Sequence, residues 1–382
     1  MSANDERKTV HERKAAFEPG KTWVIKIGSA LLTQNGAGLA TDSMSLWVEQ
    51  IVKLRQTGVQ IVLVSSGAVA EGMSRLRMKK RPRSLPMLQA AAAVGQMGLV
   101  QAYESLFQQY GLHTAQILLT HADLRSRERY LNARGTLRSL LDMGVIPVVN
   151  ENDTVVTDEI QFGDNDTLAA LVANLIEAST LLLLTDQEGL FDQDPRKSKQ
   201  AKLINERSAD DPELEKMAGG ESKFGRGGMV TKVKAGRIAA RGGANTIIAD
   251  GLQENVISLL SQGEVTGTLL LADREVLVSR KQWLAGLDSK GRILLDKGAV
   301  KVIKEQGRSL LPVGVRSVEG FFTRGEIVAC MDESGQEIAR GLINYNQAEA
   351  TSICGRSSLE IEAILGYSGE EELIHRDNLV II

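Results

Sequence analysis

The sequence contains little of several residue types, and each scarcity removes a class of protein. Only two cysteines, Cys330 and Cys354, occur among 382 residues, so no disulfide framework holds the fold together. Four scattered histidines and so few cysteines also argue against a zinc site. No run of about 18 apolar residues occurs, so we expect no membrane-spanning helix. These absences together predict a globular protein of the reducing cytoplasm.

Excess charge of either sign is also missing. The formal net charge is −3 with 24% charged residues, which argues against a large nucleic-acid-binding surface. The first twenty residues mix both signs and contain no hydrophobic stretch, so we expect a flexible tail rather than a secretory signal. Glycine, in contrast, is abundant at 37 residues. Glycine-rich turns expose backbone N–H groups, which favours phosphate binding.

The hydrophobic pattern alternates between strands and helices from residue 22 to residue 270. Such repeated βαβ units predict an α/β fold with a mostly parallel sheet covered by helices on both faces. The expected strands are 23–27, 60–64, 114–119, 145–149, 181–184 and 246–249, and the expected helices are 42–57, 86–110, 127–142, 164–177 and 229–242. Ligands of such sheets bind beyond the carboxyl ends of the strands.

After about residue 272 the segments become short and glycine recurs often. The apolar alternation at 300–303, 310–315, 327–331 and 338–342 predicts a small β-rich domain, a compact barrel. At this length two domains are the default. We therefore divide the chain into a tail (1–20), an α/β domain (21–272), a linker (273–287), a β domain (288–370) and a C-terminal segment (371–382).

Acidic and amide side chains are densest between residues 146 and 168. An apolar strand leads directly into Asn150–Asp153, and Gly163–Asp166 precedes a helical pattern. A carboxylate such as Asp153 suits an ammonium group, and the amide of Asn165 can both donate and accept. Asp166, near a helix N-terminus, is stabilised there and could hold two lysines. Helix capping alone remains the alternative for Asp166.

Two other strand ends carry groups suited to anions. Lys26 lies inside an apolar strand directly before Gly28, where its charge is costly unless a ligand uses it. The alternative is a lysine of an edge strand that points to solvent. A second strand ends at Ser65 and Ser66, followed by Gly67, which presents hydroxyl and N–H groups. A plain helix cap is compatible with the same residues.

A glycine-rich stretch, Ser222–Lys232, precedes another predicted helix. It matches neither the P-loop nor the GxGxxG pattern, and a mobile surface loop is the alternative interpretation. Lys232, however, is a second isolated lysine at a candidate phosphate site. Thr185 and Asp186 end an apolar strand and could bind a ribose or a purine edge. Two lysines without a visible nucleophile or general base favour phosphoryl transfer.

The order and spacing of these motifs resemble a known family. K-I-G-S, V-S-S-G-A-V, N-E-N-D with G-D-N-D, L-T-D-Q-E-G-L-F and G-G-M-V-T-K are similar to those of the glutamate 5-kinases, within the amino acid kinase family. The segments 310–326 and 363–367 resemble the PUA domain that follows in the long bacterial form. The resemblance covers about 21–380, nearly the whole chain.

The resemblance implies an activity and its participants. It implies phosphorylation of the γ-carboxylate of L-glutamate by ATP, accompanied by Mg²⁺, in the first step of proline biosynthesis. It also implies feedback inhibition by proline and a homo-oligomer, dimer or tetramer. No metal ligands follow from the sequence.

The resemblance also implies roles for individual residues. The catalytic residues would be Lys26, Asp166 and Lys232, and the glutamate-binding residues Ser66, Asp153 and Asn165. The nucleotide-binding residues would be Lys26, Gly28, Thr185, Asp186, Arg226, Gly227, Gly228, Met229, Val230, Thr231 and Lys232. Thr154–Phe162 would then form a flap over the substrate.

Some features depart from the family pattern, and two alternatives remain. The tail is additional, Ala30 replaces a common hydroxyl residue, and Arg226 replaces a small polar one; we expect all three to be tolerated. One alternative is a sister kinase acting on another carboxylate or phosphate acceptor. The other is an RNA-binding PUA protein. Residues 287–382 contain 11 Lys and Arg against 15 Asp and Glu, a net charge of −4, which disfavours RNA.

Overall fold

A computed structural model describes residues 20–33, 38–156, 165–219, 228–264, 266–272, 288–367 and 369–382. The chain divides into two compact units, Met1–Leu124 with Arg134–Val276 and Arg125–Ala133 with Leu277–Ile382. The expected linker and all but the last residue of the expected tail lie outside the described residues. Among the helices that the structure describes, none is both long and apolar enough to cross a bilayer.

The first unit contains an eight-stranded sheet with the order β3-β4-β2-β1-β5-β7-β8-β6. Neighbouring strands are parallel except for the antiparallel pair of β7 and β8. The mostly parallel sheet expected from the strand–helix alternation is therefore confirmed. The strands are β1 (Thr22–Ile27), β2 (Gln60–Ser65), β3 (Thr114–Leu119), β4 (Ile146–Glu151), β5 (Thr180–Thr185), β6 (Glu206–Ser208), β7 (Asn245–Asp250) and β8 (Thr268–Leu271).

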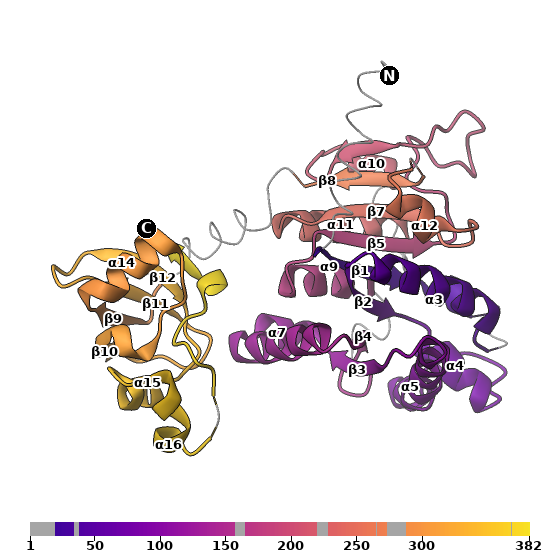
Figure 1. Cartoon of the computed structure of the whole chain (residues 1–382). Coiled ribbons are helices and arrows are strands. Elements are labelled where there is room, and N and C mark those ends of the chain that lie inside the picture. Colours follow the sequence, from indigo (N-terminus) through magenta and orange to yellow (C-terminus); the bar gives the residue numbers. More distant parts are fainter. Residues whose placement is uncertain are drawn as a thin grey trace. The chain divides into compact units, whose positions relative to one another are not determined.

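Helices cover both faces of this sheet (Figure 1). On one face α3 (Thr41–Gln56), α5 (Leu85–Gln108) and α12 (Val256–Ser261) share a core with Trp23, Ile25 and Ile27 of β1. Because side chains alternate along a strand, Lys26 faces the other side, which α9 (Asn165–Leu175) and α11 (Met229–Arg241) cover. The other helices are α2 (Ser29–Leu32), α4 (Ala68–Arg75), α6 (His121–Arg125), α7 (Arg127–Asp142) and α10 (Leu214–Met217).

The carboxyl ends of the central strands lie at one edge of the sheet. The pairing aligns Ile27 of β1 with Ser65 of β2 and with Leu184 of β5. Helices α4 and α5, which follow β2, pack so closely that only glycine fits where they cross. A Cβ at Gly72 would lie 1.7 Å from the carbonyl oxygen of Ala91, so a larger residue there would push the helices apart.

The second unit is built on a five-stranded sheet with the order β10-β9-β11-β12-β13. Its strands are β9 (Gly291–Leu295), β10 (Val315–Gly320), β11 (Ile327–Met331), β12 (Glu337–Leu342) and β13 (Leu379–Ile381). Its helices are α14 (Lys297–Gln306), α15 (Gln347–Ile353) and α16 (Ile361–Leu365), with the short 3-10 turns η1 (Pro312–Gly314), η2 (Ser358–Glu360) and η3 (Arg376–Asn378). The β-rich character expected from the sequence is confirmed.

Two predicted strands of this unit are wrong: 310–315 contains the 3-10 turn η1 and reaches β10 only at Val315, and 300–303 is helical. Residues 300–303 lie inside α14 rather than in a strand. Asp296 caps this helix by accepting a hydrogen bond from the N–H of Ala299 at 2.7 Å, and Gly307 ends it in the left-handed conformation. Ile303 is buried, and Val300 lies one turn before it on the same face. The apolar spacing was therefore that of a helix.

Candidate active site

The centre of the candidate site is a carboxylate between two lysines. The Nζ atom of Lys26 lies 2.5 Å from Oδ1 of Asp166, and the Nζ atom of Lys232 lies 3.2 Å from Oδ2. The hydroxyl of Thr231 also donates to Oδ2 at 2.7 Å. These four side chains come from β1, α9 and α11, so the fold itself brings the two lysines together.

All three charged groups of this cluster are buried. Lys26, Asp166 and Lys232 are 6%, 2% and 7% exposed. Burial raises the pKa of Asp166, but the charges of Lys26 and Lys232, with the hydrogen bonds from Lys26 and Thr231, outweigh it and hold that pKa well below its usual range. Two ammonium groups therefore face one carboxylate anion. Among the described residues of this cluster two positive charges face one negative charge, and the excess positive charge is costly in a buried position without an anion.

Two helix N-termini point at the same cluster. Asp166 lies in the first turn of α9, and Thr231, which bonds it, lies in the first turn of α11. The first N–H groups of a helix have no partner within the helix, and the helix dipole favours an anion there. Gly28 approaches closely as well, since a Cβ added to it would lie 3.9 Å from Nζ of Lys26. The arrangement suits the oxygens of a phosphoryl group.

An amide network adjoins the charged cluster. Nδ2 of Asn165, the residue before Asp166, lies 2.9 Å from the carbonyl oxygen of Ser65, 3.0 Å from the hydroxyl of Ser66 and 2.9 Å from Oδ1 of Asn150. Asn150 in turn donates from Nδ2 to Oε1 of Gln96 at 2.7 Å. The network joins the ends of β2 and β4 to α5 and to α9. It therefore fixes a polar wall beside the lysines.

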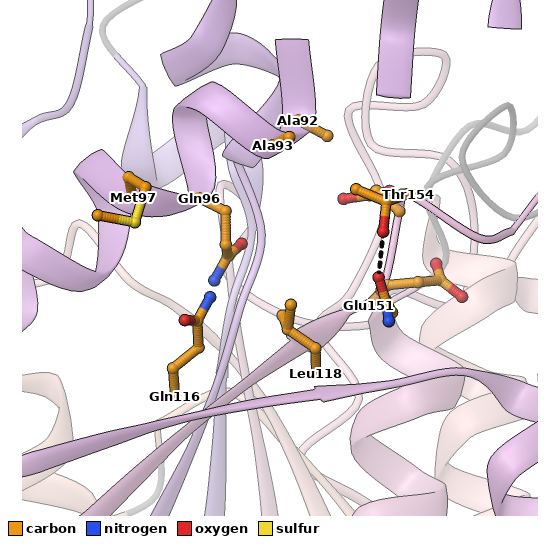
Figure 2. Close-up of a pocket in the computed structure, with 10 residues that line it drawn as sticks. Ala92, Ala93, Gln96, Met97, Gln116, Leu118, Glu151 and Thr154 are labelled. Atoms are coloured by element: carbon orange, nitrogen blue, oxygen red, sulfur yellow. Dashed lines mark hydrogen bonds between the residues drawn. The ribbon is translucent and has the colours of Figure 1, made fainter. Parts of the chain in front are cut away.

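A cavity of 180 Å³ adjoins this network at Gln96. Ala92, Ala93, Gln96 and Met97 of α5 line it opposite Gln116 and Leu118 of β3 and the segment Glu151–Thr154 (Figure 2). In Figure 2 the amide groups of Gln96 and Gln116 extend toward one another from the helix and the strand. Gln96 is 7% exposed, and its Nε2 has no hydrogen-bond partner among the described residues. A buried donor is thus available to a ligand.

Asp153 brings a titratable carboxyl group to this cavity. It is half-buried, and burial raises its pKa to about 6, while the positive charge of Arg81 partly offsets that rise. A carboxylate with so little solvation binds a cation readily, because the cation restores the lost stabilisation. The position suits an ammonium group of a small ligand.

The residues expected to contact a nucleotide fall partly within the described chain. Thr185 ends β5 and donates to the carboxylate of the exposed Asp186 at 3.1 Å. The N–H of Gly28 donates to the carbonyl oxygen of Leu184 at 3.3 Å, so this strand end adjoins β1. Gly228 precedes α11 in an extended conformation, and Met229, Val230, Thr231 and Lys232 form its first turn. Outside the described residues lie Arg226, Gly227, Gly163, Asp164 and positions 157–162 of the expected flap.

Two residues at the site were missed by the sequence reasoning. Gln96 lies in an apolar helical stretch, where an isolated glutamine is a weak signal of a polar network. Arg81 lies in a basic loop whose contacts depend on how α4 and α5 pack. In the part of the chain that the structure describes, no three His, Cys, Asp or Glu side chains are grouped to hold a metal ion.

Comparison with known proteins places this site in a family. The amino acid kinase family matches residues 21–250, and the PUA domain matches residues 291–365. The first match covers more than half of the chain. The chain therefore belongs to the amino acid kinase family.

Individual relatives narrow this assignment. The glutamate 5-kinase of Hahella chejuensis is 61% identical over 373 residues, covering 97% of each chain. Those of Saccharophagus degradans and Nitrosospira multiformis are 59% and 60% identical, covering 97% of this chain and all of theirs. Within the family the chain thus groups with the glutamate 5-kinases. A solved structure of UMP kinase from Bacillus anthracis aligns at 15% identity over 67% of this chain and 98% of its own, with a TM-score of 0.47, and adds nothing to the assignment.

Proposed function

We propose that this protein transfers the γ-phosphoryl group of ATP to the γ-carboxylate of L-glutamate, giving γ-glutamyl phosphate and ADP, the first step of proline biosynthesis. The observation that carries the proposal is the buried cluster of Lys26, Asp166 and Lys232, in which two positive charges share one carboxylate. Such a cluster stabilises the negative charge that a transferring phosphoryl group carries. Full-length relatives named glutamate 5-kinase support glutamate as the acceptor.

The reaction needs positioning and charge rather than a base. An oxygen of the γ-carboxylate attacks the γ-phosphorus, the bond from phosphorus to the β,γ-bridging oxygen breaks, and ADP leaves with those electrons. The acceptor is already an anion, so no proton has to be removed. Lys26 and Lys232 offset the negative charge on the three phosphoryl oxygens. Asp166 holds the two ammonium groups apart at fixed positions. The free N–H groups at the start of α11, those of Gly228–Thr231, take the phosphates of the nucleotide, and Gly28, whose own N–H bonds Leu184, lets the phosphates approach without a side chain in the way.

The amino acid and the nucleotide use opposite sides of this cluster. Ser66 and Asn165, which are hydrogen-bonded to each other, orient the glutamate, and Asp153 takes its ammonium group. Thr185 and Asp186 take the ribose or the base of the nucleotide, and Arg226 and Gly227 belong to the same proposed nucleotide site. Every described residue of this set lies in the first unit.

Mg²⁺ accompanies ATP in this proposal. The donor set fits a metal carried by the nucleotide rather than one caged by the protein, since no group of three His, Cys, Asp or Glu lies together among the described residues. Mg²⁺ commonly keeps several waters and is held by phosphates with few carboxylates. When bound, it would neutralise charge on the β- and γ-phosphates.

The test is acceptor selection with trapping of the product. The protein is incubated with ATP, hydroxylamine and either L-glutamate, L-aspartate or N-acetyl-L-glutamate, and acyl hydroxamate is measured. We expect a hydroxamate that depends on glutamate, because hydroxylamine captures an acyl phosphate. A larger yield with aspartate or acetylglutamate would assign the chain to a sister activity. No hydroxamate with glutamate would overturn the proposal.

Asp153 gives the reaction a defined pH dependence. Its pKa of about 6 means that the carboxyl group becomes neutral as the pH falls through that value. A neutral group cannot pair with the ammonium of glutamate, so kcat/KM for glutamate should fall about tenfold per pH unit below pH 6. Steady-state rates from pH 5 to pH 8 measure this fall of kcat/KM on the acidic side of the profile. Asp153→Asn should have a low, flat profile, and a flat wild-type profile would contradict the role.

Other properties follow from the resemblance as proposals. We propose proline as a feedback inhibitor, a homo-oligomer, dimer or tetramer, and a cytoplasmic location. Cys330 and Cys354 are both free thiols, which suits a reducing compartment. We also propose that the chain consists of an α/β catalytic domain (21–272) and a PUA-like domain (288–370). The linker (273–287) joins them, the tail (1–20) precedes them and the C-terminal segment (371–382) follows them.

A further inference from the structure

A buried amide group of α5 has a donor that the protein itself does not use. The side chain of Gln96 is 7% exposed, and its Nε2 atom makes no hydrogen bond to any described residue. Leaving a buried N–H group without a partner is costly, so native structures rarely keep one. Gln96 lines the 180 Å³ cavity, where a ligand would supply the missing acceptor.

Neighbouring groups fix the orientation of this amide. The backbone N–H of Glu151 can only donate, so the side-chain atom of Asn150 that it meets at 2.8 Å is the oxygen, Oδ1. Nδ2 of Asn150 must then be the donor at the other end, and it reaches Oε1 of Gln96 at 2.7 Å. A reversed Gln96 amide would set two donors against each other. Nε2 therefore points away from Asn150, and Figure 2 shows it turned toward the amide of Gln116.

The same cavity contains the carboxyl group of Asp153. The chain after β4 is held along α5 at two points. Asn150 donates to Gln96 at the first point. At the second, Nε2 of Gln89 donates to the carbonyl oxygen of Val156 at 3.0 Å. The two glutamines are seven residues apart, about 10 Å along the helix. Gln96 and Asp153 both line the cavity beside this stretch, so one oriented donor and one carboxyl group share a small space.

An α-amino acid carries two groups that match this pair. Its ammonium and its carboxylate are attached to the same carbon atom, so they lie side by side. The carboxylate of Asp153 suits the ammonium, and an amide N–H suits a carboxylate oxygen, because a hydrogen bond to a charged acceptor is stronger than one to a neutral acceptor. We propose that Nε2 of Gln96 donates a hydrogen bond to the α-carboxylate of the acceptor amino acid while Asp153 binds its α-ammonium group, an inference that rests on the proposed function.

The amide network gives the bound amino acid a direction. Asn165, whose amide bonds Asn150, directly precedes Asp166, the carboxylate that both lysines share. The network therefore runs from the lysines at Asn165 to the cavity at Gln96. With its α-carboxylate held at Gln96, glutamate extends its γ-carboxylate toward Asn165 and the phosphoryl group. Gln96 thus helps to select which of the two carboxylates is phosphorylated.

The test compares two ligands that differ only at the α-carboxylate. 4-Aminobutyrate keeps the ammonium and the distal carboxylate of glutamate but has a hydrogen atom in place of the α-carboxylate. NMR titrations of the full chain without ATP, at pH 8.5, should give a wild-type Kd for 4-aminobutyrate roughly 10- to 100-fold above that for glutamate, the effect of one hydrogen bond to a charged group. Gln96→Glu removes the donor but keeps the oxygen that accepts from Asn150, and it should abolish this preference.

Two further variants separate the donor from its surroundings. Gln101→Glu is the matched control, because it adds the same charge at an exposed position of the same helix, and it should keep the wild-type preference. Gln96→Met has a side chain of similar length without donor, acceptor or charge, and it should lose the preference as Gln96→Glu does. Binding of 4-aminobutyrate by the Gln96 variants reports that they are folded.

Several results would overturn the inference. Equal weakening of both ligands by the Gln96 variants would mean that Gln96 only supports the network or holds the distal carboxylate. Loss of the preference in Gln96→Met alone would assign the effect to the contact with Asn150. Equal loss in Gln101→Glu would assign it to diffuse charge. A wild-type protein without preference would show that nothing in the cavity binds the α-carboxylate.

The binding readout keeps the inference separate from the proposed function, because binding requires no ATP. A protein that prefers glutamate through Gln96 yet forms no hydroxamate fails the phosphoryl transfer alone. A protein that forms glutamyl hydroxamate but keeps its preference in both Gln96 variants fails the assignment of Gln96 alone.

Discussion

Lys232→Ala should lower kcat by about 100- to 1000-fold and change the KM for glutamate by less than about threefold. The Nζ atom of Lys232 is buried, lies 3.2 Å from Asp166 and stands in the first turn of α11. Its charge matters most when the phosphoryl group is between donor and acceptor, because negative charge then spreads over three oxygens. Glutamate binds through other groups, so its KM should hardly respond.

Lys234→Ala is the control for that variant. Lys234 lies two residues further along the same helix and is exposed, so its loss changes the charge and the helix equally but leaves the cluster intact. It should retain wild-type kcat within about twofold, as expected for a surface change. Equal kcat for Lys232→Ala and wild type would remove Lys232 from the transition state. An equal loss in both variants would attribute the effect to α11 rather than to the cluster.

Asp166→Asn should be destabilising as well as inactivating. The amide keeps the shape of the side chain but leaves Lys26 and Lys232 buried without a counter-charge. Removing one partner from a buried ion cluster costs about 3–5 kcal/mol of unfolding free energy. Activity should fall because the two ammonium groups lose the anchor between them. Urea unfolding and steady-state rates measure the two effects separately.

The matched replacement for this test is Asp42→Asn, in the exposed first turn of α3. It removes the same charge at a helix N-terminus and should cost less than about 1 kcal/mol, the usual size of a dipole interaction. Asp166→Asn with wild-type stability would mean that the lysines are solvated or paired elsewhere. A variant with normal kcat would show that Asp166 does not organise the reaction.

The fold of the first unit could be predicted largely from the sequence because its signals are local. Apolar strands of four to six residues alternate with longer helical patterns, and that order leaves few topologies other than a mostly parallel sheet. The edge of the sheet near β6 and β8 carried weaker signals: β6 has three residues and β8 pairs antiparallel with β7. Short strands give too few residues for a period to be recognised.

The second unit shows where pattern alone fails. In 300–303 both a strand and a helix fit four residues with apolar side chains at three positions. The decision lay in flanking residues, because Asp296 and Gly307 mark the two ends of a helix. If the capping residues had been considered before the apolar spacing, the sequence would have predicted a helix.

Some residues of the candidate site could likewise be predicted from the sequence, and others could not. Strand ends of a parallel sheet meet at one edge, so Lys26, Ser66 and Thr185 were expected near one another, and the structure brings Lys26 and Lys232 onto a single carboxylate. Gln96 and Arg81 could not be found by that rule. Their positions depend on the crossing of α4 and α5, where Gly72 permits the close approach. Packing of that kind leaves no periodic trace in a single sequence.

The most direct test of the central claim follows an oxygen atom. L-Glutamate labelled with oxygen-18 in its γ-carboxyl group is incubated with the protein, ATP and hydroxylamine, and the released phosphate is analysed by mass spectrometry. If the γ-carboxylate attacks phosphorus, one of its oxygens becomes the bridge of the acyl phosphate. Hydroxylamine then breaks the bond between carbon and that oxygen, so each phosphate should carry a single oxygen-18 atom. Glutamate-dependent phosphate without the label would contradict the account, because water would then be the acceptor.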